Sequence, residues 1–182
     1  MKTTSEQVTI AGQSVNIRPL KSSDSEMEAE FVRNLSAETK HFRFLGGLKE
    51  LSPAELQRLC DIDGRRSMAF VATVQKDSRE IQIGVSRYAQ SESGNVREMA
   101  VTIADEWQHK GLGRLLAMHL IDYARSHGVR QLYSVDLADN TAMRHLANDL
   151  GMRARRNEDD SNQVIYSLAL QAPAAGDVSF AK

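Results

Sequence analysis

The sequence predicts a mixed α/β domain in which a mostly antiparallel sheet is covered by helices on both faces. Two observations support this fold class. The apolar patterns follow one another in the order strand, helix, helix, three strands, helix, strand, helix, strand. Apolar residues make up 41% of a chain of 182 residues, which is enough for the core of one domain. Since helices alternate with strands, they must cover both faces of a single sheet.

The N-terminal part predicts one strand region and two helices. The run 8–17 has the pattern of a strand or hairpin, with a turn at 11–13. Asp24 predicts the N-cap of a helix with one apolar face. The segment Ser52–Glu55 is a capping box with proline at the first helical position, which predicts the second helix. The apolar residues of these two helices are Met27, Phe31, Leu35, Leu56, Leu59 and Cys60.

The rest of the chain predicts five strands and two helices. Ser67–Val74 and Ile81–Tyr88 are apolar runs separated by a charged stretch, so they predict an antiparallel pair. Glycines end both helical patterns, at Gly128 and Gly151. The remaining elements are a strand at 96–104, a helix at 112–127, a strand at 132–137, a helix from 140 and a strand at 164–170.

The amino-acid composition argues against several classes of partner and cofactor. A net charge of −1 and a pI of about 6.5 argue against a nucleic-acid partner. The single Cys60 excludes an intramolecular disulfide, and the five histidines lack metal-ligand spacing, so no metal is expected. No segment is apolar enough to span a membrane or to resemble a signal peptide, which predicts a cytoplasmic protein with no membrane partner. We expect one domain over residues 1–170 and a flexible tail over 171–182, as a monomer or homodimer.

The stretch Gln108–Gly113 lies between a predicted strand and a predicted helix. Its two glycines permit a tight turn, and the helix that follows directs its unpaired N–H groups and its dipole into that turn. Such a turn binds anions, most often phosphate. The P-loop pattern is absent, and Leu116 stands where a dinucleotide-binding turn needs its third glycine.

The spacing Gln-x-x-Gly-x-Gly, within the segment Glu98–Gly151, resembles the acetyl-CoA-binding core of the GNAT acyltransferase superfamily. The order of predicted elements also matches the GNAT fold over roughly Val15–Leu170. The resemblance implies an N-acetyltransferase with acetyl-CoA as cosubstrate, whose pyrophosphate binds at the glycine turn.

One branch of the superfamily resembles this chain further. The segments Asn16–Leu20, His41–Phe44, Leu51–Leu56, Asp61–Asp63 and Met68–Ala72 are similar to the catalytic domain of bacterial Pat-type protein-lysine acetyltransferases. This similarity implies lysine acetylation of a protein. A small-molecule amine acceptor and a non-catalytic acyl-CoA-binding sensor are the alternatives.

Glu98 is the candidate general base, because acetyl transfer to an amine requires removal of a proton. It alternates with Ala100 and Thr102 on one face of its strand, opposite an apolar face, and we expect it to be partly buried. The alternative is an exposed glutamate paired with Arg87 or Arg97. Pat-type domains carry a glutamate at the matching strand position.

The resemblance also implies the residues that hold the cofactor. Val101, Thr102 and Ile103 would act through their backbones, pairing with the pantetheine arm as with an added strand. Asn140 would contact the same arm, or serve only as an N-cap. The remaining candidates surround the pyrophosphate: Gln108, His109, Lys110, Gly111, Leu112, Gly113 and Arg114.

Two further positions bear on the chemistry. Many GNAT enzymes carry a tyrosine general acid seven residues after the asparagine, but here that position is Ala147, and Tyr133 and Tyr166 are possible substitutes. Arg43 and Phe44 are expected in the loop between the first helices, where they could shape the acceptor site. We expect Cys60 to be a core residue and not a nucleophile.

Overall fold

The computed structural model describes residues 5–46, 51–90 and 94–170, and the predicted tail 171–182 lies outside them. Eight strands form one sheet in the order β1-β2-β3-β4-β5-β6-β8-β7. Every neighbouring pair is antiparallel except β5 and β6, which run parallel. The strands are β1 (Glu6–Ile10), β2 (Gln13–Pro19), β3 (Ser67–Lys76), β4 (Arg79–Gln90), β5 (Val96–Ile103), β6 (Gln131–Leu137), β7 (Arg153–Arg156) and β8 (Gln163–Ala169).

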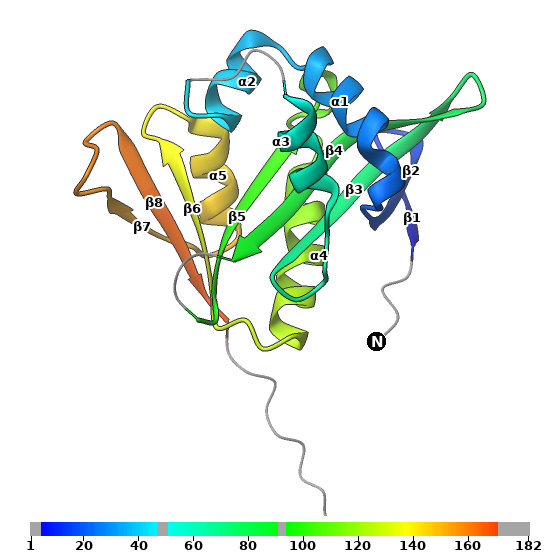
Figure 1. The fold of residues 1–182 in the computed structure, drawn as a ribbon. Helices are drawn as coiled ribbons and strands as arrows, with labels where there is room; N and C mark the ends of the chain where they lie inside the picture. The colour runs from blue at the N-terminus through cyan, green and yellow to red at the C-terminus, as the bar shows by residue number, and fades with distance from the viewer. Residues whose placement is uncertain (1–4, 47–50, 91–93, 171–182) are drawn as a thin grey trace, which may run out of the picture.

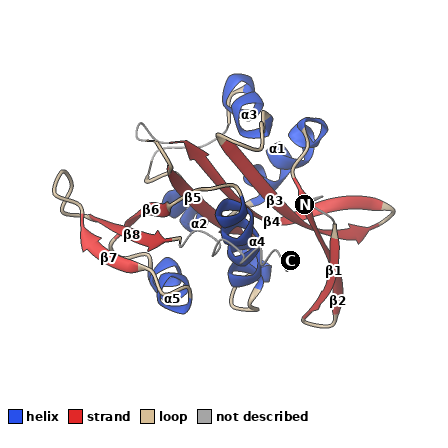
Figure 2. Cartoon of the chain, turned by 90° about the horizontal axis from the view of Figure 1, so that it is seen from below, coloured by secondary structure: helices blue, strands red, loops and turns tan. Residues whose placement is uncertain are grey.

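Helices lie on both faces of this sheet (Figure 2), as the sequence predicts. On one side are α1 (Ser25–Asn34) and α3 (Pro53–Cys60), and on the other are α4 (Leu112–Ser126) and α5 (Thr141–Asp149). The short α2 (Ala37–Arg43) lies near the ends of β5 and β6. The predicted fold class is therefore confirmed.

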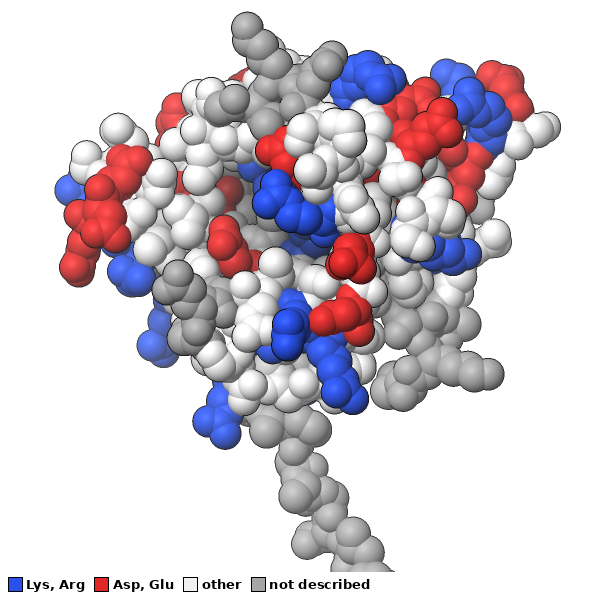
Figure 3. Space-filling view, viewed as in Figure 1, with Lys and Arg blue, Asp and Glu red and all other residues white. Residues whose placement is uncertain are grey.

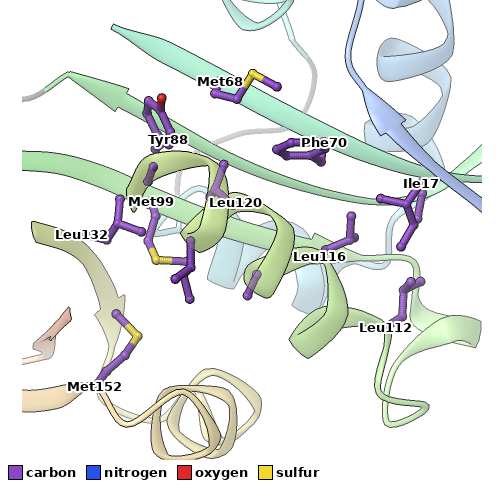
Figure 4. Packing of buried hydrophobic residues seen from close by; sticks show 14 of the residues in the cluster. Ile17, Met68, Phe70, Tyr88, Met99, Leu112, Leu116, Leu120, Leu132 and Met152 are labelled. Atoms are coloured by element: carbon purple, nitrogen blue, oxygen red, sulfur yellow. The ribbon is translucent and has the colours of Figure 1, made fainter. Parts of the chain in front are cut away.

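Alternating residues of β3 divide the core into two clusters. Met68, Phe70 and Ala72 belong to the larger cluster, with α4 and α5, whereas Ala69 and Val71 belong to the cluster under α1 and α3. This is the period of two expected for a strand covered on both faces. The face of α4 that packs on the sheet (Figure 4) has residues at helical spacing: Leu112, Leu116, Ala117, Leu120, Ile121 and Ala124.

The N-terminal strand region is a hairpin, β1–β2, whose turn residues Ala11 and Gly12 both have positive φ. The capping box of α3 is present as predicted. Asp24 precedes α1 but does not cap it with its side chain. Arg18 binds both carboxylate oxygens of Asp24, at 2.7 and 3.1 Å, and a charge-assisted pair of this kind outcompetes a backbone cap.

Two elements differ from the prediction. The structure forms α2 where a loop was expected, so Arg43 is the last residue of a helix and Phe44 follows it. The strand β7 was also missed, and all four of its residues are exposed. Neither segment carries the apolar periodicity on which the sequence prediction rests: no residue of α2 is buried.

Candidate active site

The parallel strands β5 and β6 separate partway along their length. They pair only at Val96–Gln131, Arg97–Leu132 and Glu98–Tyr133, yet both strands continue for several residues beyond. Figure 1 shows them diverging toward α2. Beyond Glu98, no described strand pairs with the edge of β5 that faces β6, so an extended ligand could hydrogen-bond to that edge as an added strand.

The glycine turn sits beside this gap and opens α4. Gly111 is the N-cap of the helix, with φ of 82°, and no side chain caps it. His109 also has positive φ, 58°, which is uncommon for a residue with a side chain. The first helical hydrogen bond in the turn runs from the N–H of Leu115 to the carbonyl of Gly111. The N–H groups of the preceding helical residues are therefore available to an anion, as predicted.

Two side chains fix the turn against α2. The Nε2 of Gln108 donates to the carbonyl of Ile103 at 3.2 Å and to Oγ1 of Thr39 at 3.1 Å. The carboxylate of Asp105 accepts hydrogen bonds from the backbone N–H and the hydroxyl of Ser36 and from the hydroxyl of Thr39. Burial raises the pKa of Asp105, but these hydrogen bonds outweigh it and hold the pKa below its usual value. The helix that the sequence did not predict is thus anchored by a residue about 70 positions away.

The gap, the turn and the start of α5 line one cleft of about 800 Å³, a size typical of small-molecule sites. Figure 3 shows basic and acidic side chains gathered around a hollow on the face seen in Figure 1. Most of the predicted site residues line the cleft together: Glu98, Val101, Thr102, Ile103, Gln108, His109, Gly111, Gly113, Arg114 and Asn140.

The side chains of two predicted residues do not line the cleft. The Nζ of Lys110 donates to the carbonyl of Glu106 at 2.6 Å and lies 5.4 Å from the ring centre of Trp107. The side chain of Leu112 is fully buried in the core below α4, because it lies on the apolar face of the helix. Leu112 can therefore contribute only its backbone N–H.

Glu98 lies at the mouth of the cleft, at the point where β5 and β6 separate. Its side chain is exposed, so the expected partial burial is wrong, because the sheet opens at this residue instead of covering it. The hydroxyl of Tyr133 lies 3.5 Å from Oε2. The alternative pairing partners are engaged elsewhere: Arg87 binds Glu28, and Arg97 donates to backbone carbonyls.

Arg43, expected in a loop that could shape the acceptor site, lines the cleft, and so does Asp136, which the sequence did not single out. Arg43 is delivered by the unpredicted α2. Asp136 comes from β6, where it interrupts the apolar run Leu132–Leu137. A carboxylate in a strand whose neighbours at Val135 and Leu137 are apolar is the signal that could have found it.

Asn140 caps α5: its Oδ1 accepts from the N–H of Met143 at 3.0 Å. The N-cap role is confirmed, and a contact with the cofactor stays a prediction. Ala147 is fully buried, and Tyr166 belongs to the core. Tyr133, beside Glu98, is thus the better placed of the two possible substitutes for the missing tyrosine.

Cys60, the last residue of α3, is buried in the cluster between α1, α3 and the sheet, and burial raises the pKa of its thiol, which fits a core residue. Within the described ranges, no three His, Cys, Asp or Glu residues are grouped as a metal site would require. None of the described helices is both long and apolar enough to cross a membrane.

A glycine turn at a helix N-terminus, beside two strands that splay apart, is the arrangement that the resemblance to GNAT acyltransferases implies for a phosphate-bearing donor. Residues 14–153 match the family model for the acetyltransferase (GNAT) domain. Since this match covers more than half of the chain, the protein belongs to the GNAT family and is an acetyltransferase.

Individual relatives agree with this assignment. The chain is 53% identical to acetyltransferase PA5475 of Pseudomonas aeruginosa over 159 residues, which cover 87% of this chain and 86% of that protein. It is 28% identical to acetyltransferase Pat of Mycolicibacterium smegmatis over 146 residues, 77% of this chain but only 41% of that longer protein. The GNAT domain of S. lividans PAT has the same fold, with a TM-score of 0.82 at 23% identity, over 91% of this chain and 97% of that one. The resemblance to Pat-type domains is thereby confirmed.

Proposed function

We propose that the protein transfers an acetyl group from acetyl-CoA directly to the side-chain amine of a protein lysine, with Glu98 as general base. One observation carries this proposal: a carboxylate without an ion-pair partner among the described residues stands where β5 and β6 separate, in the same cleft as the helix N-terminus. A site that only bound acyl-CoA would not need that carboxylate.

The cleft fits acetyl-CoA. The N–H groups at the start of α4 match a pyrophosphate, and the open edge of β5 matches an extended pantetheine arm. Thr102 supports occupancy by a ligand, because its buried hydroxyl has no hydrogen-bond partner among the described residues. The residues that would hold the cofactor are Val101, Thr102, Ile103, Gln108, His109, Gly111, Gly113, Arg114 and Asn140, with the backbone of Leu112.

When bound, acetyl-CoA supplies an activated thioester. The chain must then make the acceptor amine neutral, because a free lysine has a pKa near ~10.4 and is an unreactive ammonium at neutral pH. Glu98 takes that proton, directly or through water, which is typically worth ~10²–10⁴ in rate. A backbone N–H of β5 stabilises the negative charge that develops on the carbonyl oxygen.

The leaving sulfur has no tyrosine at the position where many GNAT enzymes carry one, since Ala147 is buried there. We therefore propose that it leaves as a thiolate or takes its proton from water. Direct transfer in a ternary complex follows, because Cys60 is buried away from the cleft and offers no covalent route.

Two classes of acceptor suit the cleft. A protein lysine is favoured by the similarity to Pat-type domains and by the exposed Glu98 at the mouth of the cleft. A small-molecule amine is the second candidate, because part of the cleft lies under α2, where Arg43 and Phe44 could enclose a small acceptor.

The test combines the purified protein with acetyl-labelled acetyl-CoA and a cell extract. We expect label on protein lysines, identified by mass spectrometry, and its loss with Glu98→Gln but not with Glu106→Gln, an exposed glutamate outside the cleft. Label found only on small molecules would show that the acceptor is a small-molecule amine instead of a protein lysine, and the protein would still be an acetyltransferase. Tight acetyl-CoA binding without transfer would favour a sensor.

A further inference from the structure

Charged side chains extend from beneath α1 into the cleft. At the buried end, Glu28 accepts from Nη2 of Arg87 at 2.5 Å and from Nε2 of Gln82 at 2.6 Å. Both members of this ion pair are buried, so their charges compensate each other locally. Arg43 from α2, Glu98 from β5 and Asp136 from β6 line the cleft on the three elements that meet where β5 and β6 separate.

Arg43 is a positive charge without a close negative partner. Its guanidinium lies 5.1 Å from the ring centre of Phe44, and it forms no ion pair with a described residue. Burial, together with the like charge of Arg87, lowers the pKa of Arg43 to about 10, while nearby carboxylates, Asp136 and Glu98 among them, act in the opposite direction. Arg43 therefore remains charged at neutral pH, and Asp136 and Glu98 compensate it only at longer range.

Asp136 is a carboxylate with spare hydrogen-bonding capacity. Ser134 donates its hydroxyl to Oδ2 at 2.5 Å, and Oδ1 accepts no hydrogen bond from a described residue. Burial is the main influence and raises the pKa of Asp136, while Ser134 and Arg43 lower it and Glu98 raises it. A half-buried carboxylate with an open oxygen gains most from a charged donor.

The charges of Arg43, Glu98 and Asp136 favour an additional cation beside them. Where α2, β5 and β6 meet, Glu98 and Asp136 provide two carboxylates and Arg43 provides one guanidinium, so an ammonium bound there would offset the remaining negative charge. The hydroxyl of Thr102, on a residue that is 94% buried, is a further polar group of the same cleft that no described residue satisfies. These two observations are independent, since one concerns charge and the other a neutral hydroxyl.

We propose that Asp136 is a second carboxylate for the acceptor, which binds its ammonium before Glu98 removes the proton, and that Arg43 is the counter-ion of this pair when no acceptor is bound. The inference rests on the proposed function and makes it narrower. The acceptor must be a cationic primary amine. Asp136 only holds the ammonium. Glu98 takes one proton and frees the nitrogen lone pair; the N–C bond then forms as the C–S bond breaks, and the second proton of the acylated nitrogen goes to the leaving thiolate, directly or through water.

The first test is Asp136→Asn in steady-state kinetics with a lysine-containing peptide. Loss of a charge-assisted hydrogen bond raises the KM for the peptide about 10- to 100-fold, with a smaller change in kcat and no change in the KM for acetyl-CoA. Asp139→Asn is the matched control, because Asp139 is exposed three residues further along and does not line the cleft. An unchanged peptide KM in Asp136→Asn overturns the proposal.

The second test uses a variant that should lower the KM for the peptide instead of raising it. Arg43→Gln removes the competing positive charge, so the KM for the peptide falls severalfold. An unchanged or higher KM overturns the counter-ion role. This variant also covers the case in which Asp136→Asn does not fold, because Arg43 lies at the end of a short surface helix.

The two proposals fail in different ways. If the wild-type protein acetylates a lysine peptide or a small amine and Asp136→Asn does so equally well, only the role of Asp136 is wrong. If the wild-type protein transfers acetyl to no amine at all, the proposed function is wrong and this inference fails with it.

Discussion

Alanine at Gly111 and alanine at Gly113 should have opposite effects, although the two glycines are only two residues apart. Gly111 has φ of 82°, and a Cβ there would meet no atom within 4 Å, so the cost is backbone strain alone, about 1–2 kcal/mol. At Gly113 no positive φ is required, and a Cβ would come 3.5 Å from Cγ1 of Ile103, an ordinary contact. Alanine there gains about 0.5–1 kcal/mol, because glycine is the weaker helix former.

These free energies become measurable shifts in thermal unfolding of the ligand-free protein. For a chain of this size, 1 kcal/mol moves Tm by about 2–4 °C. Gly111→Ala therefore lowers Tm by about 2–8 °C, whereas Gly113→Ala raises it by about 1–4 °C. Gly111→Asn is the control, since asparagine tolerates the left-handed conformation better than alanine.

The same variants test the anion site by calorimetric titration with acetyl-CoA below either Tm. Strain at Gly111 reorients the N–H groups that open α4, so Gly111→Ala weakens binding at least about 10-fold, the effect of one misplaced charge-assisted hydrogen bond. Gly113→Ala stays within about threefold of wild type. If Gly111→Ala loses stability but binds acetyl-CoA normally, the turn does not hold the pyrophosphate and the reasoning is refuted.

Three further predictions follow from other contacts. Glu98→Gln lowers kcat by ~10²–10⁴ without changing the Kd of acetyl-CoA. Near-normal turnover would remove Glu98 from the role of base. Tyr133→Phe removes the hydroxyl that lies 3.5 Å from the Glu98 carboxylate and should have a much smaller effect on kcat. Glu28→Ala leaves Arg87 buried without its partner and destabilises the fold by about 3–5 kcal/mol, a fall in Tm of roughly 6–20 °C in a melting curve; a loss of a degree or two would contradict it. The hydrogen bond from Arg18 holds the pKa of Glu80 below its usual value, so the stability that this carboxylate contributes is present above the unfolded-state pKa near ~4.3 and lost as pH falls further. Glu80→Gln should therefore make Tm fall less steeply from pH 5 to pH 3 than in the wild type, and an equally steep fall would refute the assignment.

The sequence predicts those parts of the fold where burial imposes a period. The face of α4 and the alternation along β3 follow directly from apolar spacing, because each element packs against the sheet. In contrast, α2 buries no residue and depends on hydrogen bonds to Asp105, and β7 is an exposed edge of charged residues. Contacts between distant residues hold these two segments, and such contacts leave no local pattern.

The candidate site divides in the same way. The glycine turn was predictable because Gly111 needs a positive φ and a helix follows it. The opposite wall of the cleft was not, because Arg43 depends on the unpredicted α2. The exposure of Glu98 depends on where β5 and β6 stop pairing, which no property of either strand alone determines.

The short pairing between β5 and β6 affects how readily the sheet opens locally in solution. Strands β1 to β5 and strands β6 to β8 are joined within the sheet by only three residue pairs, so this seam is the place where the sheet is least cross-linked. A pantetheine arm bound along β5 would fill the seam and tie the two parts together. We therefore expect acetyl-CoA to slow amide hydrogen exchange in β6 and β8 as well as in β5, because the bound cosubstrate also stabilises the sheet against local opening.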